Sequence, residues 1–504
     1  MNKFEDYLNV TKEIGIVEKI SPSVIYVRGL PGAKLFELIM FESGENGQVF
    51  SLSRDYVEIL LLKKAEIKIG TKVARTNETL KIPLGSFMLG KALDALGTVV
   101  GLEKGIKFSE YRVLDSAPPG INVRKNIDKP FETGVTIVDL VTPLGRGQRQ
   151  LVIGDRKTNK TQFLLQNLYT QAASGTICIY AAIAKRKLDT AMIHNFLSNE
   201  KIKNNTILVA SAPDDVPGLV FLTPYTAITI AEYFRDMGRD VLVVLDDMTA
   251  HAKYYREISL LAKRFPGRSS YPGDIFYIHA KIMERGGNFL LFKDLDISTK
   301  TKISPDQVKE VSITLLPVAE MVMGDFSGYI QTNLMAMTDG HIYFDREYFN
   351  QGRRPAINPF LSVTRVGRQA QTQLLRELSR VLTSFLVSHE KLRQYMHFGA
   401  ELSEETQRTL SLGDKIQSLF DQPSNVTVPL NLSVILFAAL WVGYWKEKGL
   451  SDLKNDLKRF SQKYMEGGSF KKGIDDIIEG SSTFEVLLDK LRKSQMDILQ
   501  TISK

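Results

Sequence analysis

The chain has 504 residues, of which 43% are hydrophobic and 24% charged, and its formal net charge at pH 7 is +8. This length and apolar content predict a globular protein with real hydrophobic cores and two to four domains, and they exclude a low-complexity chain. The basic residues are spread along the chain without a long basic block, so we expect no nucleic-acid partner.

A single cysteine, Cys178, rules out an internal disulfide framework and fits a reducing cytoplasm. The first residues, MNKFEDYLNV, carry acids and lack the apolar core of a signal peptide, which argues against secretion. The most apolar stretch, residues 430–445, is shorter than the ~20 residues of a membrane-spanning helix. We interpret it as a buried helix and expect a cytoplasmic protein.

Three regions follow one another along the chain. Residues 1–82 contain short alternating or β-branched runs separated by Pro and Gly, which predict a small β-barrel or sandwich. In residues 83–365 strand-like apolar runs alternate with helical stretches, the pattern of a mostly parallel sheet with crossover helices. Residues 366–504 show apolar side chains at helical spacing and predict a helical domain. The expected fold class is therefore multidomain α/β.

The segment GDRKTNKT, residues 154–161, follows an apolar run and precedes the helical stretch FLLQNLYTQAA. Strand, tight loop and helix are the context of a phosphate-binding loop, G-x-x-x-x-G-K-[ST], whose backbone N–H groups wrap a phosphate. Gly154, Lys160 and Thr161 fit this pattern, whereas Asn159 replaces the second glycine. We expect the whole loop to bind nucleotide, through Gly154, Asp155, Arg156, Lys157, Thr158, Asn159, Lys160 and Thr161.

The run VLVVLDD, residues 241–247, is an apolar strand that ends in acids. Such a strand end can place a carboxylate where it holds magnesium through water. Asp246 is the first candidate and Asp247 the second, while a buried strand that simply ends in solvent-facing acids is the structural alternative. We expect Mg²⁺ to be held by Thr161 and Asp246.

A hydrolytic site also needs a group that orients or deprotonates the attacking water. Its expected place is the C-terminal end of the strand after the loop helix, where open parallel sheets bind their ligands. The sequence there reads AAIAKRKLD, with Lys185 where a carboxylate would be wanted, and a cation cannot act as the base. Asp189 lies further on and fits a solvated helix face. We therefore expect the chain not to be catalytic by itself.

The stretch RPAINPFLSVTRVG, residues 354–367, is a Pro-punctuated loop that carries Arg365. An arginine donated into a neighbouring subunit's site can stabilise the transferring phosphoryl group, an effect of ~10³ to 10⁵ in rate. Most loop arginines, however, are solvated or structural.

Several long segments resemble the alpha subunit of F-type ATP synthases, in order from about residue 14 to about residue 444: GRGQRQLVIGDRKTNKT, IAEYFRDMGRDVLVVLDD, YREISLLAKRFPGRSSYPGDIFYIHAKIMER, TDGHIYFDREYFNQGRRPAINPFLSVTRVG and ILFAALWVGY. The patterns GDRxTxKT and RPAxNPxxSVxRVG distinguish this subunit from the beta subunit, whose loop is richer in glycine. The resemblance implies a β-barrel crown, a RecA-like P-loop domain and a C-terminal helical domain. It also implies a ring of three alpha and three beta subunits around a central shaft.

The resemblance also implies roles for single residues. Lys160 and Thr161 would contact the phosphate and magnesium of a non-exchanging ATP or ADP, and Asp246 would be the acidic strand end of that site. Arg365 would reach into the catalytic site of the neighbouring beta-type subunit. Lys185 stands where the alpha family usually has Gln and the beta family has the catalytic Glu.

By the same resemblance, Phe349, Arg354 and Pro355 would form part of the adenine surroundings. Gln422 keeps one of two family glutamines near the base, and Ser424 replaces the other.

Two departures concern the loop itself. Asn159 adds a side chain where the backbone approaches phosphate, although Asn adopts a left-handed backbone more readily than most residues. Lys157 replaces the usual Gln and adds a cation that favours phosphate. We expect nucleotide binding to be retained but altered.

Two further departures concern partners. Only about a dozen residues precede Ile14, fewer than in the family's usual stator-binding extension. Residues 400–423 are partly similar to the lever segment of the beta subunit, with Glu401, Glu404 and Glu405 as an acidic face, although a solvated helix-turn explains these acids equally well. Together they indicate a paralogous F-type-like complex, similar to those of small-genome wall-less bacteria, with non-standard stator or motor partners.

The main hypothesis is a non-catalytic, alpha-like subunit of a rotary ATPase hetero-hexamer, which holds nucleotide structurally and donates Arg365 to a beta-type subunit. A second hypothesis is the ring scaffold of a specialised motor for motility or surface machinery, with vestigial nucleotide binding. A third is a self-sufficient hexameric ATPase of the protein-export or RNA-translocase type, against which Lys185 argues. We expect any membrane contact to occur through the larger complex, at the cytoplasmic face.

Overall fold

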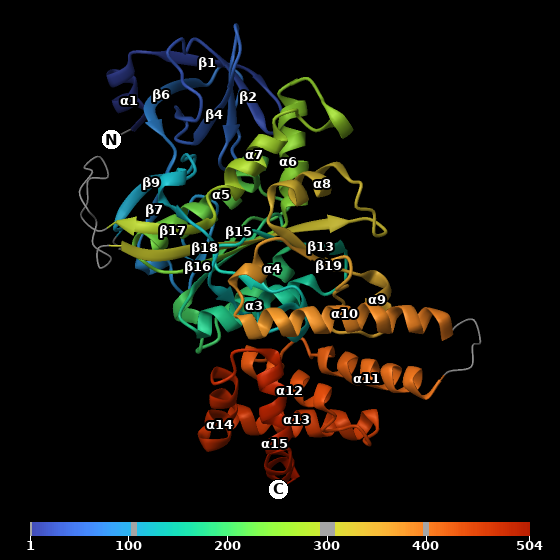
Figure 1. Cartoon of the computed structure of the whole chain (residues 1–504). Helices are drawn as coiled ribbons and strands as arrows, with labels where there is room; N and C mark the ends of the chain where they lie inside the picture. Colours follow the sequence, from blue (N-terminus) through green and yellow to red (C-terminus); the bar gives the residue numbers. More distant parts are fainter. Residues whose placement is uncertain (1–2, 102–107, 293–307, 397–402, 504) are drawn as a thin grey trace. The chain divides into compact units, whose positions relative to one another are not determined.

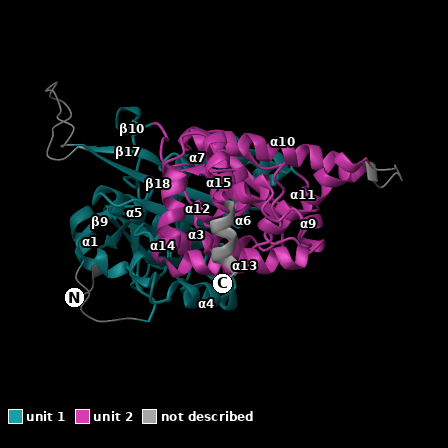
Figure 2. Ribbon diagram, turned by 60° about the horizontal axis from the view of Figure 1, so that its bottom comes forward, with its two compact units in different colours: residues 1–125, 172–320, 326–338 teal, residues 126–171, 321–325, 339–504 magenta. Residues whose placement is uncertain are grey.

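The computed structural model describes residues 3–101, 108–292, 308–396 and 403–503. The chain forms two compact units, teal and magenta in Figure 2. Unit 1 comprises residues 1–125, 172–320 and 326–338, and unit 2 comprises residues 126–171, 321–325 and 339–504. The domain limits expected after residues 82 and 365 remain predictions.

The N-terminal part of unit 1, blue in Figure 1, is a closed antiparallel barrel with the strand order β1-β2-β5-β4-β3-β6. Closure pairs the first strand with the last, so that no edge is left for another chain to join. Val17, Ile25 and Phe41 belong to its fully buried interior. The barrel expected from the short runs is thus confirmed. Its strands are β1 (Ile14–Ile20), β2 (Val24–Arg28), β3 (Glu37–Phe41), β4 (Asn46–Leu52), β5 (Val57–Leu61) and β6 (Lys72–Thr79).

A short helix, α1 (Lys3–Thr11), precedes the barrel and packs on its outer side, where Phe4 contacts Met40 and Ala74. After the barrel, β7 (Lys81–Leu84) pairs in antiparallel fashion with β9 (Glu110–Val113).

The rest of unit 1 contains a mostly parallel sheet, as the alternating pattern predicted. Four strands neighbour one another in parallel after the short β8 (Ala92–Leu93): β15 (Thr206–Ala210), β14 (Ile177–Ala182), β16 (Val241–Asp246) and β18 (Val308–Met321). β17 (Gly287–Phe292) is antiparallel and links β18 to β10 (Arg124–Lys125). Every residue of β14 and β16 is buried, which explains their uninterrupted apolar sequences. The helices are α4 (Lys187–Leu197), α5 (Pro217–Asp236), α6 (Met248–Leu261), α7 (Ile275–Met283) and α8 (Tyr329–Met337).

In unit 2, β13 (Gln150–Asp155) pairs in parallel with β19 (Gly340–Phe344), and β20 (Val363–Thr364) is antiparallel to β19. The short strands β11 (Pro130–Phe131) and β12 (Leu144–Gly145) pair with each other. The helices α2 (Thr136–Val141), α3 (Lys160–Ala173) and α9 (Arg346–Asn350) complete this part of the unit.

The C-terminal helices, orange to red in Figure 1, confirm the helical domain. They are α10 (Gln373–Met396), α11 (Glu404–Phe420), α12 (Leu430–Val442), α13 (Leu450–Glu466), α14 (Gly468–Glu479) and α15 (Phe484–Ser503). The apolar α12 is buried along most of its length and ends at Gly443, whose φ of 98° provides the left-handed turn that stops a helix. Among the described residues, no helix combines the length and apolar character needed to cross a membrane.

The proposed acidic face lies at the start of α11. Glu404 and Glu405 occupy its exposed first turn, where Ser403 caps the helix by accepting a hydrogen bond from Thr406 N. Negative charges near a helix N-terminus stabilise the helix through its dipole. This effect is sufficient to explain why two carboxylates occur at the start of α11. Glu401 lies outside the described residues.

Candidate nucleotide-binding site

The loop between β13 and α3 has the backbone of a phosphate-binding loop. It runs from the strand end at Asp155 to the helix start at Lys160, and Lys157 (φ 63°) and Asn159 (φ 72°) adopt left-handed conformations within it. Asn is enriched among the non-glycine residues with this geometry. Asn159 therefore supports, without glycine, the turn that the loop requires.

Gly154 is required by a close approach of the neighbouring strand. A Cβ added at this position would lie 2.4 Å from the carbonyl oxygen of Phe344 on β19, which as backbone cannot give way. The first glycine of the pattern is thus explained by packing within unit 2.

The side chains of the loop present positive charge. Lys160 Nζ donates to the carbonyl oxygens of Gly154 (2.8 Å) and Asp155 (2.6 Å), and Thr158 Oγ1 donates to Asp155 O (2.8 Å). Arg156 and Lys157 are exposed. These cations accompany the N-terminus of the long helix α3, where the backbone N–H groups and the helix dipole attract an anion. The loop therefore fits a phosphate group.

In unit 1, the predicted metal ligand Asp246 is buried and both of its carboxylate oxygens are engaged. Oδ1 lies 2.8 Å from Lys185 Nζ, and Oδ2 accepts a hydrogen bond of 2.5 Å from Tyr180 OH. Burial, followed by the charge of Asp246, holds the pKa of Tyr180 well above its usual value, so this phenol keeps its proton. Asp246 is therefore not the solvent-facing acid of the structural alternative.

Lys185 stays charged in this setting. Burial by itself would lower the pKa of its ammonium, but the charges of Asp246 and Asp247 outweigh burial and raise it. The backbone is also fixed, because Lys185 N donates to Ser211 O (3.1 Å) and Ile183 N donates to Asp246 O (2.8 Å). The end of β14 thus carries a cation.

The second acid, Asp247, caps α6 by accepting a hydrogen bond of 2.5 Å from Ala250 N. Burial and then the charge of Asp246 raise the pKa of Asp247 to about 6. Asp189 lies in the exposed first turn of α4 and pairs with Arg186 at 3.0 Å. Asp189 therefore sits on a solvated helix face, as the sequence indicated.

Of the residues predicted to surround adenine, Phe349 and Arg354 are in direct contact. The guanidinium of Arg354 lies over the ring of Phe349, 3.7 Å from its centroid, and donates to Phe349 O (2.9 Å) and Arg353 O (2.7 Å). The two side chains therefore form one stacked pair within unit 2.

Gln422 is buried, and its amide is occupied by backbone groups. Oε1 accepts from Thr136 N (3.0 Å), and Nε2 donates to Gly134 O (2.7 Å) and Val426 O (2.7 Å). Its own N–H donates to Arg354 O (2.7 Å), which ties it to the stacked pair. Gln422 therefore holds segments of unit 2 together, and a role toward adenine stays a prediction.

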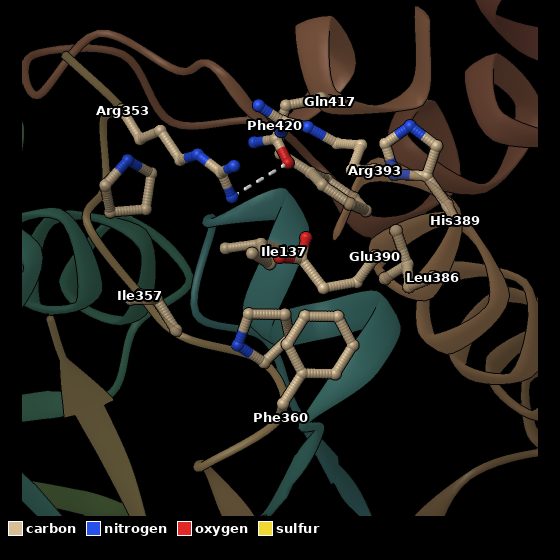
Figure 3. A pocket seen from close by; sticks show the side chains of 12 residues that line it. Ile137, Arg353, Ile357, Phe360, Leu386, His389, Glu390, Arg393, Gln417 and Phe420 are labelled. Atoms are coloured by element: carbon tan, nitrogen blue, oxygen red, sulfur yellow. Dashed lines mark hydrogen bonds between the residues drawn. The ribbon is translucent and has the colours of Figure 1, made fainter. Parts of the chain in front are cut away.

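Pro355 lines a small cavity of unit 2 (Figure 3). At the polar side of the cavity, Arg353 donates to Gln417 Oε1 (3.4 Å). Apolar side chains such as those of Ile137 and Phe360 line the cavity as well. Its volume of about 20 Å³ has room for a single water molecule and not for a purine. The part that Pro355 plays toward a nucleotide stays a prediction.

Arg365 directly follows β20, and its side chain is exposed. Its backbone N–H donates to Asp339 O (3.0 Å), while Asp339 Oδ1 pairs with Arg149 at 2.9 Å. The preceding Thr364 donates from Oγ1 to Pro143 O (2.9 Å). Burial, helped by the charge of Arg365, lowers the pKa of His341. An exposed guanidinium is thus carried on a firmly held backbone.

The amino-acid sequence alone does not mark out Tyr180 and Asp339 as residues of these sites. Tyr180 lies in the middle of an apolar strand, and only the register of β14 against β16, Ala182 opposite Asp246, brings its hydroxyl to the acid. Asp339 is one of many acids before a strand, and no feature of the sequence marks it out. Within the described residues, no group of three or more His, Cys, Asp or Glu side chains is arranged to hold a metal ion.

A parallel strand, a loop with two left-handed residues and a helix that opens with Lys-Thr define a P-loop nucleotide-binding protein. Comparison with known proteins specifies the family. The sequence model of the ATP synthase alpha/beta family, nucleotide-binding domain, matches residues 134–364, and that of the ATP synthase alpha/beta chain, C terminal domain, matches residues 371–502. The chain is 35% identical over 478 residues to ATP synthase subunit alpha of Neorickettsia sennetsu, a match that covers 93% of this chain and 90% of that protein. It therefore belongs to the F-type ATP synthase alpha-subunit family.

Proposed function

We propose that the chain is a non-catalytic, alpha-type subunit of an F-type or F-type-like rotary ATPase. The observation that carries this proposal is the ion pair of 2.8 Å between Lys185 and Asp246. A hydrolytic site needs a base or a water-orienting group, and the strand end where open sheets position such a group carries a charged ammonium here. A group that has no lone pair to offer cannot accept the proton of water.

The chain's own nucleotide site then has a structural role. The left-handed Asn159, the cationic Lys160 and the start of α3 support binding of the phosphates of ATP or ADP. Without a base, a bound nucleotide remains intact and stabilises the folded subunit through mass action.

The contribution to catalysis is made through Arg365. Its guanidinium is exposed and its backbone is held on both sides, as expected of a side chain that must reach another protein with little freedom. We infer that it enters the catalytic site of a beta-type subunit, in a ring that alternates the two chains around a central shaft. There it would stabilise charge on the transferring phosphoryl group.

The test is steady-state ATP hydrolysis by the assembled complex with Arg365→Ala in this chain. Turnover is expected to fall by ~10³ while the complex still assembles, because the charge stabilisation in the transition state is lost. The matched control is Arg368→Ala, which removes an exposed arginine of the same segment. Equal turnover in the Arg365 and Arg368 variants would refute the role.

A further inference from the structure

Two buried glutamines contact the short strand β20, which ends directly before Arg365. Gln148 comes just before β13 and Gln150 begins that strand, and both residues are fully buried. Gln148 Nε2 donates to Gln150 Oε1 (2.7 Å), and Gln150 Nε2 donates to Val363 O (3.0 Å). The two amides therefore link the start of β13 to a carbonyl two residues before Arg365, all within unit 2.

A second branch of this network reaches Thr364. Gln148 Nε2 also donates to Thr364 Oγ1 (3.3 Å), whose hydroxyl donates in turn to Pro143 O (2.9 Å). Gln148 Oε1 accepts from Gly145 N (2.8 Å), so the amide nitrogen and the amide oxygen are both engaged. These partners fix which way the amide of Gln148 faces, because only its oxygen can accept from an N–H group.

The close approach of these groups requires a glycine in β19. A Cβ added at Gly340 would lie 2.2 Å from Val363 O and 2.7 Å from Gln150 Oε1. Since the first of these atoms belongs to the backbone, a side chain at this position would displace β20. Gly340 therefore leaves the space in which the amide of Gln150 meets β20.

Hydrophobic burial does not explain the two amides. The residues that follow them in β13 are apolar and fully buried, so apolar side chains suit this strand: Leu151, Val152 and Ile153. Taking an amide out of water costs free energy that its hydrogen bonds offset with little net gain. What a satisfied polar network adds is one defined arrangement of the segments that it joins.

Three consecutive residues are held in this region. The carbonyl of Val363 and the hydroxyl of Thr364 are bound by the amides, and the N–H of Arg365 donates to Asp339 O (3.0 Å). The side chain of Arg365 is nevertheless exposed. A guanidinium on such a backbone loses little freedom when it meets a partner, which is what exact placement toward a reacting group requires.

We propose that Gln148 and Gln150 are positioning residues for Arg365. They hold the backbone that carries the guanidinium, and they affect the reaction in the beta-type subunit only through that arginine. This inference rests on the role of Arg365 in the proposed function. It assigns the two amides to the placement of the arginine and gives them no part in nucleotide binding by the chain's own loop.

The test is steady-state ATP hydrolysis by the assembled complex with Gln148→Met, which keeps the unbranched shape of the side chain and removes its amide. The kcat is expected to fall by about tenfold, because a small displacement of a catalytic group is costly, while KM for ATP stays unchanged. Thr364→Val removes the hydroxyl that Gln148 contacts and should reproduce this result. It replaces the Gln148 variant if that variant does not assemble.

The matched control is Gln171→Met in α3. This change removes another buried glutamine of unit 2, one that donates to Glu132 O (2.6 Å), and turnover should equal that of the wild type. Binding of the fluorescent nucleotide mant-ADP to the purified full chain should be the same for the wild type and Gln148→Met. The reason is that the phosphate-binding loop follows the other end of β13.

A double-mutant cycle separates positioning from a general structural effect. If the amides act only through Arg365, Gln148→Met should not lower the residual turnover of Arg365→Ala any further. An equal loss of kcat in both backgrounds would overturn the inference, and so would a Gln148→Met complex that turns over like the Gln171 control. A wild-type rate in Arg365→Ala would instead refute the proposed function, and with it the role of the two amides.

Discussion

Asn159 is the residue at which the loop departs most from the P-loop pattern, and its backbone explains why the departure is tolerated. The loop needs a left-handed residue immediately before Lys160, and Asn159 provides it with a φ of 72°. A left-handed conformation costs an ordinary L-residue about 1–2 kcal/mol, a cost that Asn lowers and Gly avoids. The side chain is partly exposed, so it does not have to be accommodated in the core.

The nucleotide affinity of variants at position 159 should therefore depend on how readily the new residue adopts the left-handed backbone conformation. Asn159→Ala is expected to weaken mant-ADP binding to the full chain by about tenfold, because Ala disfavours the left-handed loop by roughly 1–2 kcal/mol. Asn159→Gly should bind at least as tightly as the wild type. The idea that backbone geometry governs this position would be abandoned if the Ala and Gly variants had the same affinity.

At the scale of elements, the segment from β20 to the start of α10 fixes the position of Arg365. Gly367 lies against the carbonyl of Pro143, and a Cβ added there would lie 1.8 Å from that oxygen and 2.6 Å from Thr364 Oγ1. The nearest contact is backbone, so a larger residue must displace the segment that carries Arg365.

Gly367→Ala is accordingly expected to lower turnover of the assembled complex by roughly tenfold to a hundredfold, since a displacement of about 1 Å can cost that much. Binding of mant-ADP to the isolated chain should stay unchanged. The control is Gly473→Ala in α14, where an added Cβ would meet no atom within 4 Å. Turnover equal to that of the control would show that this segment does not position the arginine.

The sequence predicts those features that depend on neighbours along the chain. The strand, loop and helix around residues 154–161 follow from a local pattern, and so do the alternating strands and helices. The engagement of Asp246 by Tyr180 depends on strand register, and the hydrogen bond from Thr136 N to Gln422 joins residues 286 positions apart. Contacts of this kind are set by tertiary packing. Neither the periodicity of the sequence nor the spacing of its motifs predicts them.

At the scale of the whole molecule, the chain consists of three regions in sequence order. The N-terminal barrel is closed, the central region carries the P-loop and the helical region follows it, as family membership also indicates. Lys185 argues against hydrolysis in this chain, while the exposed Arg365 suits an action on a partner. A self-sufficient hexameric ATPase would need a base that the described residues do not provide at the end of β14.

The most direct test of this division of labour is ATP hydrolysis by the purified full chain, measured alone and after assembly with its beta-type partner. Such a division of labour predicts no turnover above background for the chain alone and steady turnover for the complex. Hydrolysis by the chain alone at a rate close to that of the complex would contradict it.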